Sequence, residues 1–206
     1  MKKIIFAAAA LFAFGFANAQ DAKEESAGGM GFANGDIFIT GSVGFGSQTT
    51  GDAKENTFDV SPSVGFFVSD NIAIGARLGY MSTKTNSGLP GEDDATANTF
   101  SIGAFGRYYA TPASQFSMFV ELGANYHSTT TNSGAPGEED AKNNGFGIAL
   151  SPGVSYFMSE NWALEASIAA LSYNTDKPDF DGAESTNTFG LNVNLTNINL
   201  GLIYKF

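Results

Sequence analysis

Asn56-Thr57-Phe58 is the first of four copies of one short pattern in this chain; the others are Asn98-Thr99-Phe100, Asn144-Gly145-Phe146 and Asn187-Thr188-Phe189. In each copy a polar or acidic stretch ends on Asn, a small residue and Phe, and a run of alternating apolar residues begins. Each copy therefore marks a strand that enters an apolar layer after a segment in water. Four such strands need four partners that run the other way, so the pattern predicts eight antiparallel strands.

The runs between and after these copies alternate between apolar residues and small or polar ones. In the run 116–127 every even position is apolar, whereas the odd positions include Ser117, Glu121 and His127. The last run alternates from Ile198 to Phe206 and ends on an aromatic residue. A period of two indicates strands with one apolar face. A soluble β-sandwich gives the same alternation, so the period alone does not exclude it.

Strand length and the placement of aromatic residues favour a membrane barrel over the sandwich. The runs are about ten residues long, which is what a tilted strand needs to cross the hydrocarbon core of a bilayer. Aromatic residues gather at the strand ends, where a membrane barrel places them at the two lipid–water interfaces. They are Phe58, Phe100, Phe116, Tyr126, Phe146, Trp162, Tyr204 and Phe206, of which Trp162, Tyr204 and Phe206 are the candidate interface aromatics.

The connections between the runs alternate between short and long. The short ones are 69–71, 111–115 and 159–161, and the longer, hydrophilic ones lie around 47–55, 85–97, 129–143 and 175–186. Outer-membrane barrels have this asymmetry, with short periplasmic turns and long extracellular loops. We therefore predict an all-β fold, an eight-stranded antiparallel up-and-down transmembrane β-barrel; a soluble sandwich is the alternative.

The amino terminus has the pattern of a secretory signal. Lys2 and Lys3 precede an apolar run from Ile4 to Phe16, and Ala17-Asn18-Ala19 is a small-x-small cleavage site. The run is shorter than the roughly 20 residues of a membrane-spanning helix. We predict a signal peptide at 1–19, a flexible periplasmic lead-in at 20–35, which is polar and rich in glycine, and the barrel at 36–206.

Composition excludes several classes of function. The chain has 10 basic and 21 acidic residues, a net charge of −11, and loss of Lys2 and Lys3 leaves 8 against 21, or −13. This balance argues against binding of nucleic acid, which needs clusters of Lys and Arg facing phosphates. There are no cysteines, so disulfides and thiolate metal sites are absent. We expect no cofactor and no metal.

Two internal repeats support the topology. The stretch from Pro62 to Asn71 matches that from Pro152 to Asn161, and each leads into a short turn. The stretch from Thr85 to Ala95 recurs from Thr131 to Ala141, so two of the long loops are equivalent.

The first of these repeats, the signal peptide, the strand that begins at Trp162 and the Tyr204-Lys205-Phe206 ending together resemble a known family. It is the outer-membrane β-barrel domain family of Gram-negative bacteria, particularly its Bacteroidetes-like members, similar in plan to the small OmpA/OmpX-type barrels. The resemblance implies an outer-membrane location, contact with outer-membrane lipid and lipopolysaccharide, and a monomeric barrel. The terminal aromatic residue resembles the signal that the barrel-assembly machinery reads during insertion.

Five charged residues fall on the inward positions of their strands. They are Asp59, Arg77, Arg107, Glu121 and Glu165, the candidate lumenal charge network. Arg107 and Glu121 are equally far from the turn near Ser114, which predicts that they face each other on neighbouring strands. Charges confined inside an eight-stranded barrel should pair. We interpret the set as a polar plug; the alternative is a gate or selectivity element.

Two other polar features are candidates for chemistry. His127, followed by Ser128, is the single histidine, and lipid A deacylase barrels use a His–Ser pair; however, alternation turns His127 inward and no nearby motif supplies an oriented carboxylate. The acidic clusters Glu92-Asp93-Asp94 and Glu138-Glu139-Asp140 lack the ligand spacing of a dedicated calcium site, and we read them as solvated charges.

We assign no catalytic residue. The sequence predicts a non-enzymatic integral outer-membrane protein that contributes envelope structure or surface interaction through acidic extracellular loops. A narrow porin-like channel for small solutes is the first alternative, and a lipid-modifying outer-membrane enzyme is the second.

Overall fold

The computed structural model describes residues 29–89, 93–135, 137–191 and 198–206. The strands are β1 (Ile37–Thr50), β2 (Ala53–Phe67), β3 (Ile72–Asn86), β4 (Ala95–Tyr109), β5 (Phe116–Asn132), β6 (Ala141–Phe157), β7 (Trp162–Ser167), β8 (Leu171–Pro178), β9 (Thr186–Leu191) and β10 (Asn199–Lys205). Among the described residues no helix has the length and apolar character needed to span a membrane. The predicted signal peptide lies outside the described residues.

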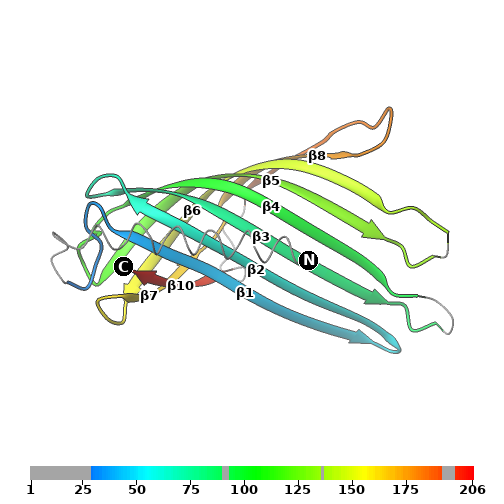
Figure 1. Cartoon of the computed structure of the whole chain (residues 1–206), viewed down its shortest axis with the longest axis horizontal. Helices are drawn as coiled ribbons and strands as arrows, with labels where there is room; N and C mark the ends of the chain where they lie inside the picture. Colours follow the sequence, from blue (N-terminus) through cyan, green and yellow to red (C-terminus); the bar gives the residue numbers. More distant parts are fainter. Residues whose placement is uncertain (1–28, 90–92, 136, 192–197) are drawn as a thin grey trace.

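The strands form one closed antiparallel barrel. Each of β1 to β6 pairs with the next, and β7 and β8 together form the seventh strand and β9 and β10 the eighth. Pairing of β10 with β1, from Phe38↔Lys205 to Gly41↔Leu202, closes the ring. Figure 1 shows the short turns and the end of β10 at one end of the barrel and the longer hairpins at the other. The prediction of an eight-stranded barrel is confirmed.

The strands extend further into the hairpins than the sequence predicted. Strands β1 to β6 have 14 to 17 residues rather than about ten. The connection predicted at 47–55 is a turn at Gly51 and Asp52, and the strands on either side take up the rest. The polar Thr, Asn and Lys residues in these segments continue the backbone ladder beyond the apolar belt, so strands take up most of the first predicted loop and the ends of the other three.

The seventh strand contains an irregularity that alternation did not predict. Gly153 pairs with Ser167 and Leu150 pairs with Leu171, so three residues of the seventh strand lie opposite two of β6. One extra residue makes a β-bulge, and it reverses which positions face outward. Trp162 and Leu164 face outward before it, and Leu171 and Tyr173 after it. The bulge lies opposite Pro152, which has no backbone N–H to donate.

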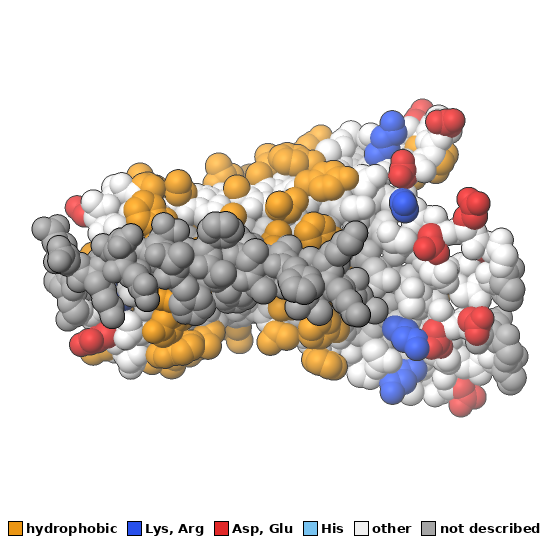
Figure 2. All heavy atoms as spheres, viewed as in Figure 1, with side chains coloured by type: hydrophobic (Ala, Val, Ile, Leu, Met, Phe, Trp, Pro, Cys, Tyr) orange, Lys and Arg blue, Asp and Glu red, His pale blue; other side chains and the backbone are white. Residues whose placement is uncertain are grey.

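The outer surface has the apolar belt of a membrane protein. Phe58, Phe100 and Phe146 each lie five residues after the alanine that begins β2, β4 or β6. On the face seen in Figure 2, hydrophobic side chains lie along the middle part of the barrel, and most charged side chains gather at the hairpin end. The repeated Phe therefore marks the border between the apolar belt and the polar hairpins.

The short turns at 68–71 and 158–161 are structural copies of each other. Asn71 donates its side-chain amide to the Tyr109 carbonyl at 2.7 Å, and Asn161 donates to the Lys205 carbonyl at 2.9 Å. The backbone N–H groups of Tyr109 and Lys205 return hydrogen bonds to the two asparagine carbonyls at 2.8 and 2.7 Å. The repeat therefore provides two matching turns, each of which holds the end of a neighbouring strand.

The end of the lead-in folds into the short-turn end of the barrel. Phe32 is 2% exposed and stacks on Phe67 at 4.7 Å between ring centroids, and its backbone N–H donates to the Pro112 carbonyl. The Nζ of Lys205 donates to the carbonyls of Gly29 and Gly31. The predicted flexible lead-in is therefore wrong for residues 29–35, whereas 20–28 lie outside the described residues.

Phe32 completes a cluster of buried aromatic rings inside the barrel. We call the six rings that contact one another the aromatic layer; they are Phe32, Phe38, Phe67, Tyr109, Phe119 and Phe157, and Phe105 is a further buried ring. Phe32 contacts four of the other five rings at centroid distances of 4.7 to 5.3 Å. The layer fills most of the lumen at the short-turn end, where Lys205 is buried beside the Phe157 ring.

Candidate functional site: a lumenal charge network

Arg107 and Glu121 form the centre of a charged cluster directly above the aromatic layer. They are cross-strand partners on β4 and β5, and Arg107 Nε lies 2.6 Å from Glu121 Oε2. Both side chains are almost fully buried, at 3% and 7% exposed. The sequence predicted this pair, because two residues equidistant from one turn share a register position.

Glu165 binds the other side of the Arg107 guanidinium from across the lumen. Arg107 Nη1 lies 2.7 Å from Glu165 Oε2, and Nη2 lies 3.4 Å from Oε1. Thr40 on β1 donates its hydroxyl to Glu165 at 2.8 Å. The two-pronged contact fixes the plane of the guanidinium, as Arg–carboxylate pairs do. Arg107 therefore ties β4 to both β5 and β7.

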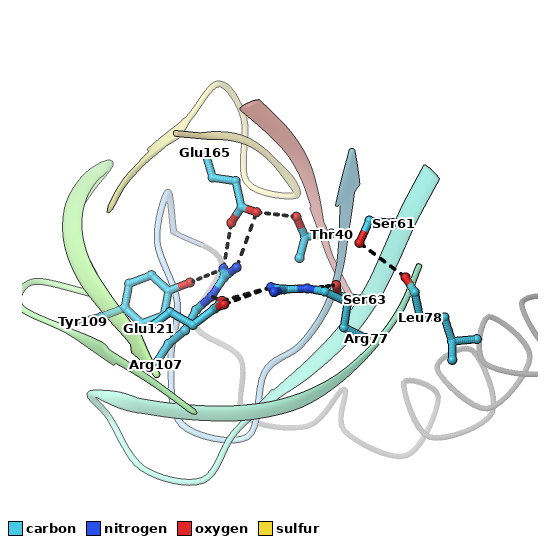
Figure 3. Close-up of polar contacts among 9 residues, drawn as sticks. All are labelled: Thr40, Ser61, Ser63, Arg77, Leu78, Arg107, Tyr109, Glu121 and Glu165. Carbon is cyan, nitrogen blue, oxygen red and sulfur yellow. Dashed lines mark hydrogen bonds and ion pairs between the residues drawn. The ribbon is translucent and has the colours of Figure 1, made fainter. Parts of the chain in front are cut away.

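Arg77 extends the cluster to β3. Its Nη2 lies 3.1 Å from each oxygen of Glu121, and its Nε donates to the Ser63 hydroxyl at 3.0 Å. Figure 3 shows Arg77 and Arg107 approaching Glu121 from two sides, with Glu165 beyond Arg107. We call Arg77, Arg107, Glu121 and Glu165 the lumenal network. Two cations and two anions balance within it, which offsets part of the cost of burying charge.

The network rests on the aromatic layer. Arg107 lies over the Phe119 ring at 4.6 Å and the Phe105 ring at 5.0 Å, and Arg77 lies 5.1 Å from Phe105. Arg107 Nη1 also donates to the Tyr109 hydroxyl at 3.2 Å. Aromatic rings lie below the Arg107 guanidinium and carboxylates lie beside it, so the guanidinium has almost no contact with solvent. Network and layer together fill the cross-section of the barrel.

Asp59, predicted to extend the network, stays outside it. Its carboxylate makes no hydrogen bond or ion pair with any residue that the structure describes. It leans over Gly44, its cross-strand partner on β1, where a Cβ would lie 2.0 Å from Oδ1. Asp59 lies four positions along β2 from Ser63, which is the partner of Arg77. That spacing along the strand is too long for the two charges to pair.

A polar cavity occupies the lumen on the hairpin side of the network. It has a volume of about 310 Å³, and we call it the outer chamber. Its walls include Asp59, Arg77, Glu165 and several serines, among them Ser42 and Ser61. A second cavity of about 290 Å³ shares Asp59 and Ser61 with it and reaches Ser101 and His127. Small side chains on inward positions leave this space.

His127 has a carboxylate partner that the sequence did not reveal. Its Nε2 lies 2.8 Å from Oδ1 of Asp176 on β8, and the two side chains meet over Gly145 of β6. Asp176 falls in a segment predicted as loop, so no signal assigned it an inward position. Ser128 follows His127 directly on β5, and successive residues of a strand face opposite sides. A catalytic His127–Ser128 pair is therefore not formed.

The candidate interface aromatics gather on the outer surface at the short-turn end. Trp162 and Tyr204 are cross-strand partners with ring centroids 4.9 Å apart, and Tyr204 and Phe206 are 5.0 Å apart. Trp162 is 43% exposed. A cluster of this kind at one rim of the apolar belt is typical of an interfacial girdle.

The two repeated hairpins organise their acidic residues with the same hydrogen bonds. Asn86 donates to Asp94 at 2.6 Å, and Asn132 donates to Asp140 at 2.8 Å. Hydrogen bonds from Lys84 and then Asn86 hold the pKa of Asp94 below its usual value. Gly88 and Gly134 have φ values of 77° and 79°, which favour glycine. Of the first acidic cluster, Glu92 lies outside the described residues.

The barrel architecture agrees with a comparison with protein families. Residues 6–206 match the model of the outer membrane protein beta-barrel domain. The chain belongs to this outer-membrane β-barrel family. Among curated proteins, none matches the chain. The family places the protein in the outer membrane, so the short turns are the periplasmic end and the hairpins the extracellular end.

Solved structures of similar fold are small outer-membrane barrels. OprG from Pseudomonas aeruginosa is 16% identical with a TM-score of 0.53, and the match covers 86% of this chain and 99% of that one. Neisserial surface protein A is 18% identical with a TM-score of 0.49, covering 82% and 97%. At these identities the likeness to OprG shows the fold alone.

Proposed function

We propose that this outer-membrane barrel is a non-conducting, non-enzymatic envelope protein whose extracellular hairpins provide its surface for interaction. The observation that carries the proposal is the filled cross-section at the periplasmic end. The six rings of the aromatic layer fill the lumen at one level, and the buried Arg107–Glu121 pair fills it at the next level along the barrel axis. An eight-stranded barrel has an interior just wide enough for side chains to fill.

The hairpins support a role outside the membrane. Strands β3 and β4 remain paired up to Thr85↔Ala95, and β5 and β6 up to Thr131↔Ala141. This regular pairing makes stiff ribbons that end in acidic turns. A stiff ribbon loses little conformational entropy on binding a partner, which favours recognition.

Conductance in planar lipid bilayers tests the proposal. The purified, folded protein should give no steady channel current in 1 M KCl. The double variant Arg107→Ala with Glu121→Ala leaves the aromatic layer in place and should also stay closed. Combining it with Phe32→Ala, which removes a ring from that layer, should produce measurable openings. Steady current through the wild-type protein would instead establish the porin-like channel.

A lipid-modifying enzyme has less support. His127 and Asp176 face the lumen, whereas the acyl chains of membrane lipid lie against the outer surface. Incubation of the folded protein with lipopolysaccharide, followed by mass spectrometry of the lipid A, should give unchanged lipid A. Loss of an acyl chain that depends on His127 would overturn the non-enzymatic assignment.

A further inference from the structure

The outer chamber has a charge imbalance that the lumenal network does not remove. Two guanidinium groups and three carboxylates line it: Arg77 and Arg107 against Asp59, Glu121 and Glu165. Four of these five groups pair with one another. Asp59 is the fifth, and it has no partner within the described residues. The chamber therefore carries one surplus negative charge at a known position.

Comparison with Glu165 shows that Asp59 is unusual. Each of these carboxylates leans over a glycine directly opposite on the neighbouring strand, Gly201 for Glu165 and Gly44 for Asp59. Glu165 uses the space to reach Arg107 and Thr40. Asp59 uses the same arrangement to project a carboxylate toward empty volume. An unpaired, half-buried charge costs folding free energy unless something binds to it.

The surroundings of Asp59 indicate the chemistry of the missing partner. Ser42 and Ser61 are cross-strand partners on the lumenal face two residues below the level of Gly44 and Asp59, and the chamber also contains Ser151 and Ser167. Hydroxyl groups accept and donate hydrogen bonds, so the walls suit a polar molecule. One carboxylate is too little charge for a divalent cation, which takes several oxygen ligands. No group of three His, Asp or Glu side chains suited to a metal occurs in the described part of the chain.

We infer that the outer chamber binds a small polar amine, whose ammonium group pairs with Asp59 and whose polar remainder bonds to the serine hydroxyls. The volume of about 310 Å³ admits a molecule of a few non-hydrogen atoms together with water. The lumenal network and the aromatic layer close the chamber on its periplasmic side, so the amine is held rather than passed to the periplasm. This inference does not depend on the role of the hairpins.

Ethanolamine, ethylene glycol and glycolate are suitable probes because they match in size and carry positive, zero and negative charge. Binding is measured by chemical-shift titration of the folded, isotope-labelled protein in lipid nanodiscs. Ethanolamine should shift resonances of residues that line the chamber and saturate, whereas the other two should not. Asp59→Asn should weaken ethanolamine binding about tenfold or more, as expected when a charge-assisted hydrogen bond is lost.

Asp52→Asn is the matched control, because Asp52 lies exposed in the turn between β1 and β2 and losing it changes the net charge equally. This variant should bind ethanolamine as the wild type does. Asp59→Asn removes an unpaired charge without changing side-chain size, so it should still fold. Equal binding by Asp59→Asn, equal binding of glycolate, absence of any ethanolamine shift, or displacement of ethanolamine by equimolar Ca²⁺ would each overturn the inference.

Discussion

Arg107 is the central buried charge of this barrel, because each nitrogen of its guanidinium donates a hydrogen bond. Glu121, Glu165 and the Tyr109 hydroxyl receive its N–H groups, and the Phe119 ring lies against its face. A guanidinium with five donors in one plane suits this arrangement, whereas a lysine ammonium could not bridge both carboxylates in the same way. Loss of Arg107 leaves Glu165 without its ion-pair partner and leaves Glu121 with Arg77 alone.

Arg107→Ala should therefore destabilise the barrel by about 3–5 kcal/mol, because it leaves Glu121 and Glu165 without their central cation. Lys142→Ala, at an exposed position of β6, should change stability by less than about 0.5 kcal/mol. Reversible urea unfolding in lipid vesicles gives both values. The double change with Glu121→Ala should cost less than the two single changes summed. Simple additivity would mean that the pair contributes no coupling.

The sequence predicted all four residues of the lumenal network but the register of only one of its pairs, for a geometric reason. Arg107 and Glu121 are joined by one short turn, so counting from its centre gives their register. Glu165 reaches Arg107 across the lumen, and that contact depends on how the whole barrel closes. Asp176 was missed because polar strand beyond the apolar belt cannot be told from loop by hydrophobic alternation.

At the level of elements, the lead-in is the largest departure from expectation. Residues 29–35 carry no periodicity, and glycine surrounds the one aromatic residue, so nothing in the segment indicates burial. The carbonyls of Gly29 and Gly31 accept hydrogen bonds from the buried Lys205 near the end of β10. The signal that could have indicated this docking is Lys205 itself, an inward charge at the short-turn end whose ion-pair partner Asp36 precedes β1.

Phe32→Ala should cost about 3 kcal/mol, because it opens a cavity among four packed rings. Met30→Ala is the control in the same segment, since Met30 is 45% exposed, and it should have little effect. Urea midpoints compared at equal protein-to-lipid ratio provide the measurement. Equal midpoints for Phe32→Ala and the wild type would show that the lead-in is not part of the folded core.

Strand β10 makes the closing contacts, and Phe206 follows it directly. The backbone N–H of Phe206 donates to the Ile37 carbonyl at 3.0 Å, and its ring lies against Tyr204. Phe206→Asp would place a charge at the rim of the apolar belt, where aromatic rings are favoured. We expect less assembled protein in the outer membrane and an unchanged amount exported to the periplasm. Immunoblots of separated fractions check this, with Lys142→Ala as the control, and normal outer-membrane levels would contradict it.

At the scale of the whole molecule, closure of the hydrogen-bonded ring replaces the disulfides that the chain cannot form. The pairing between β1 and β10 joins residues more than 160 positions apart in sequence. With this pairing β1 and β10 each gain a second neighbour, so their backbone groups at the short-turn end are paired rather than left as an edge in lipid. Sequence predicted this closure from strand count and connection lengths, whereas a two-residue period could not reveal the bulge opposite Pro152.

A closed ring should make the protein heat-modifiable. The unboiled protein, extracted from outer membranes in detergent, should migrate differently on a gel from the boiled protein, because the barrel resists detergent until heated. Deletion of 199–206 removes β10 and should abolish the unboiled form, since β1 and β7 then lose a partner. Deletion of Asp181 and Gly182, at the exposed tip of the β8–β9 hairpin, should leave it unchanged. Identical migration of boiled and unboiled wild-type protein would contradict closure of the barrel in the membrane.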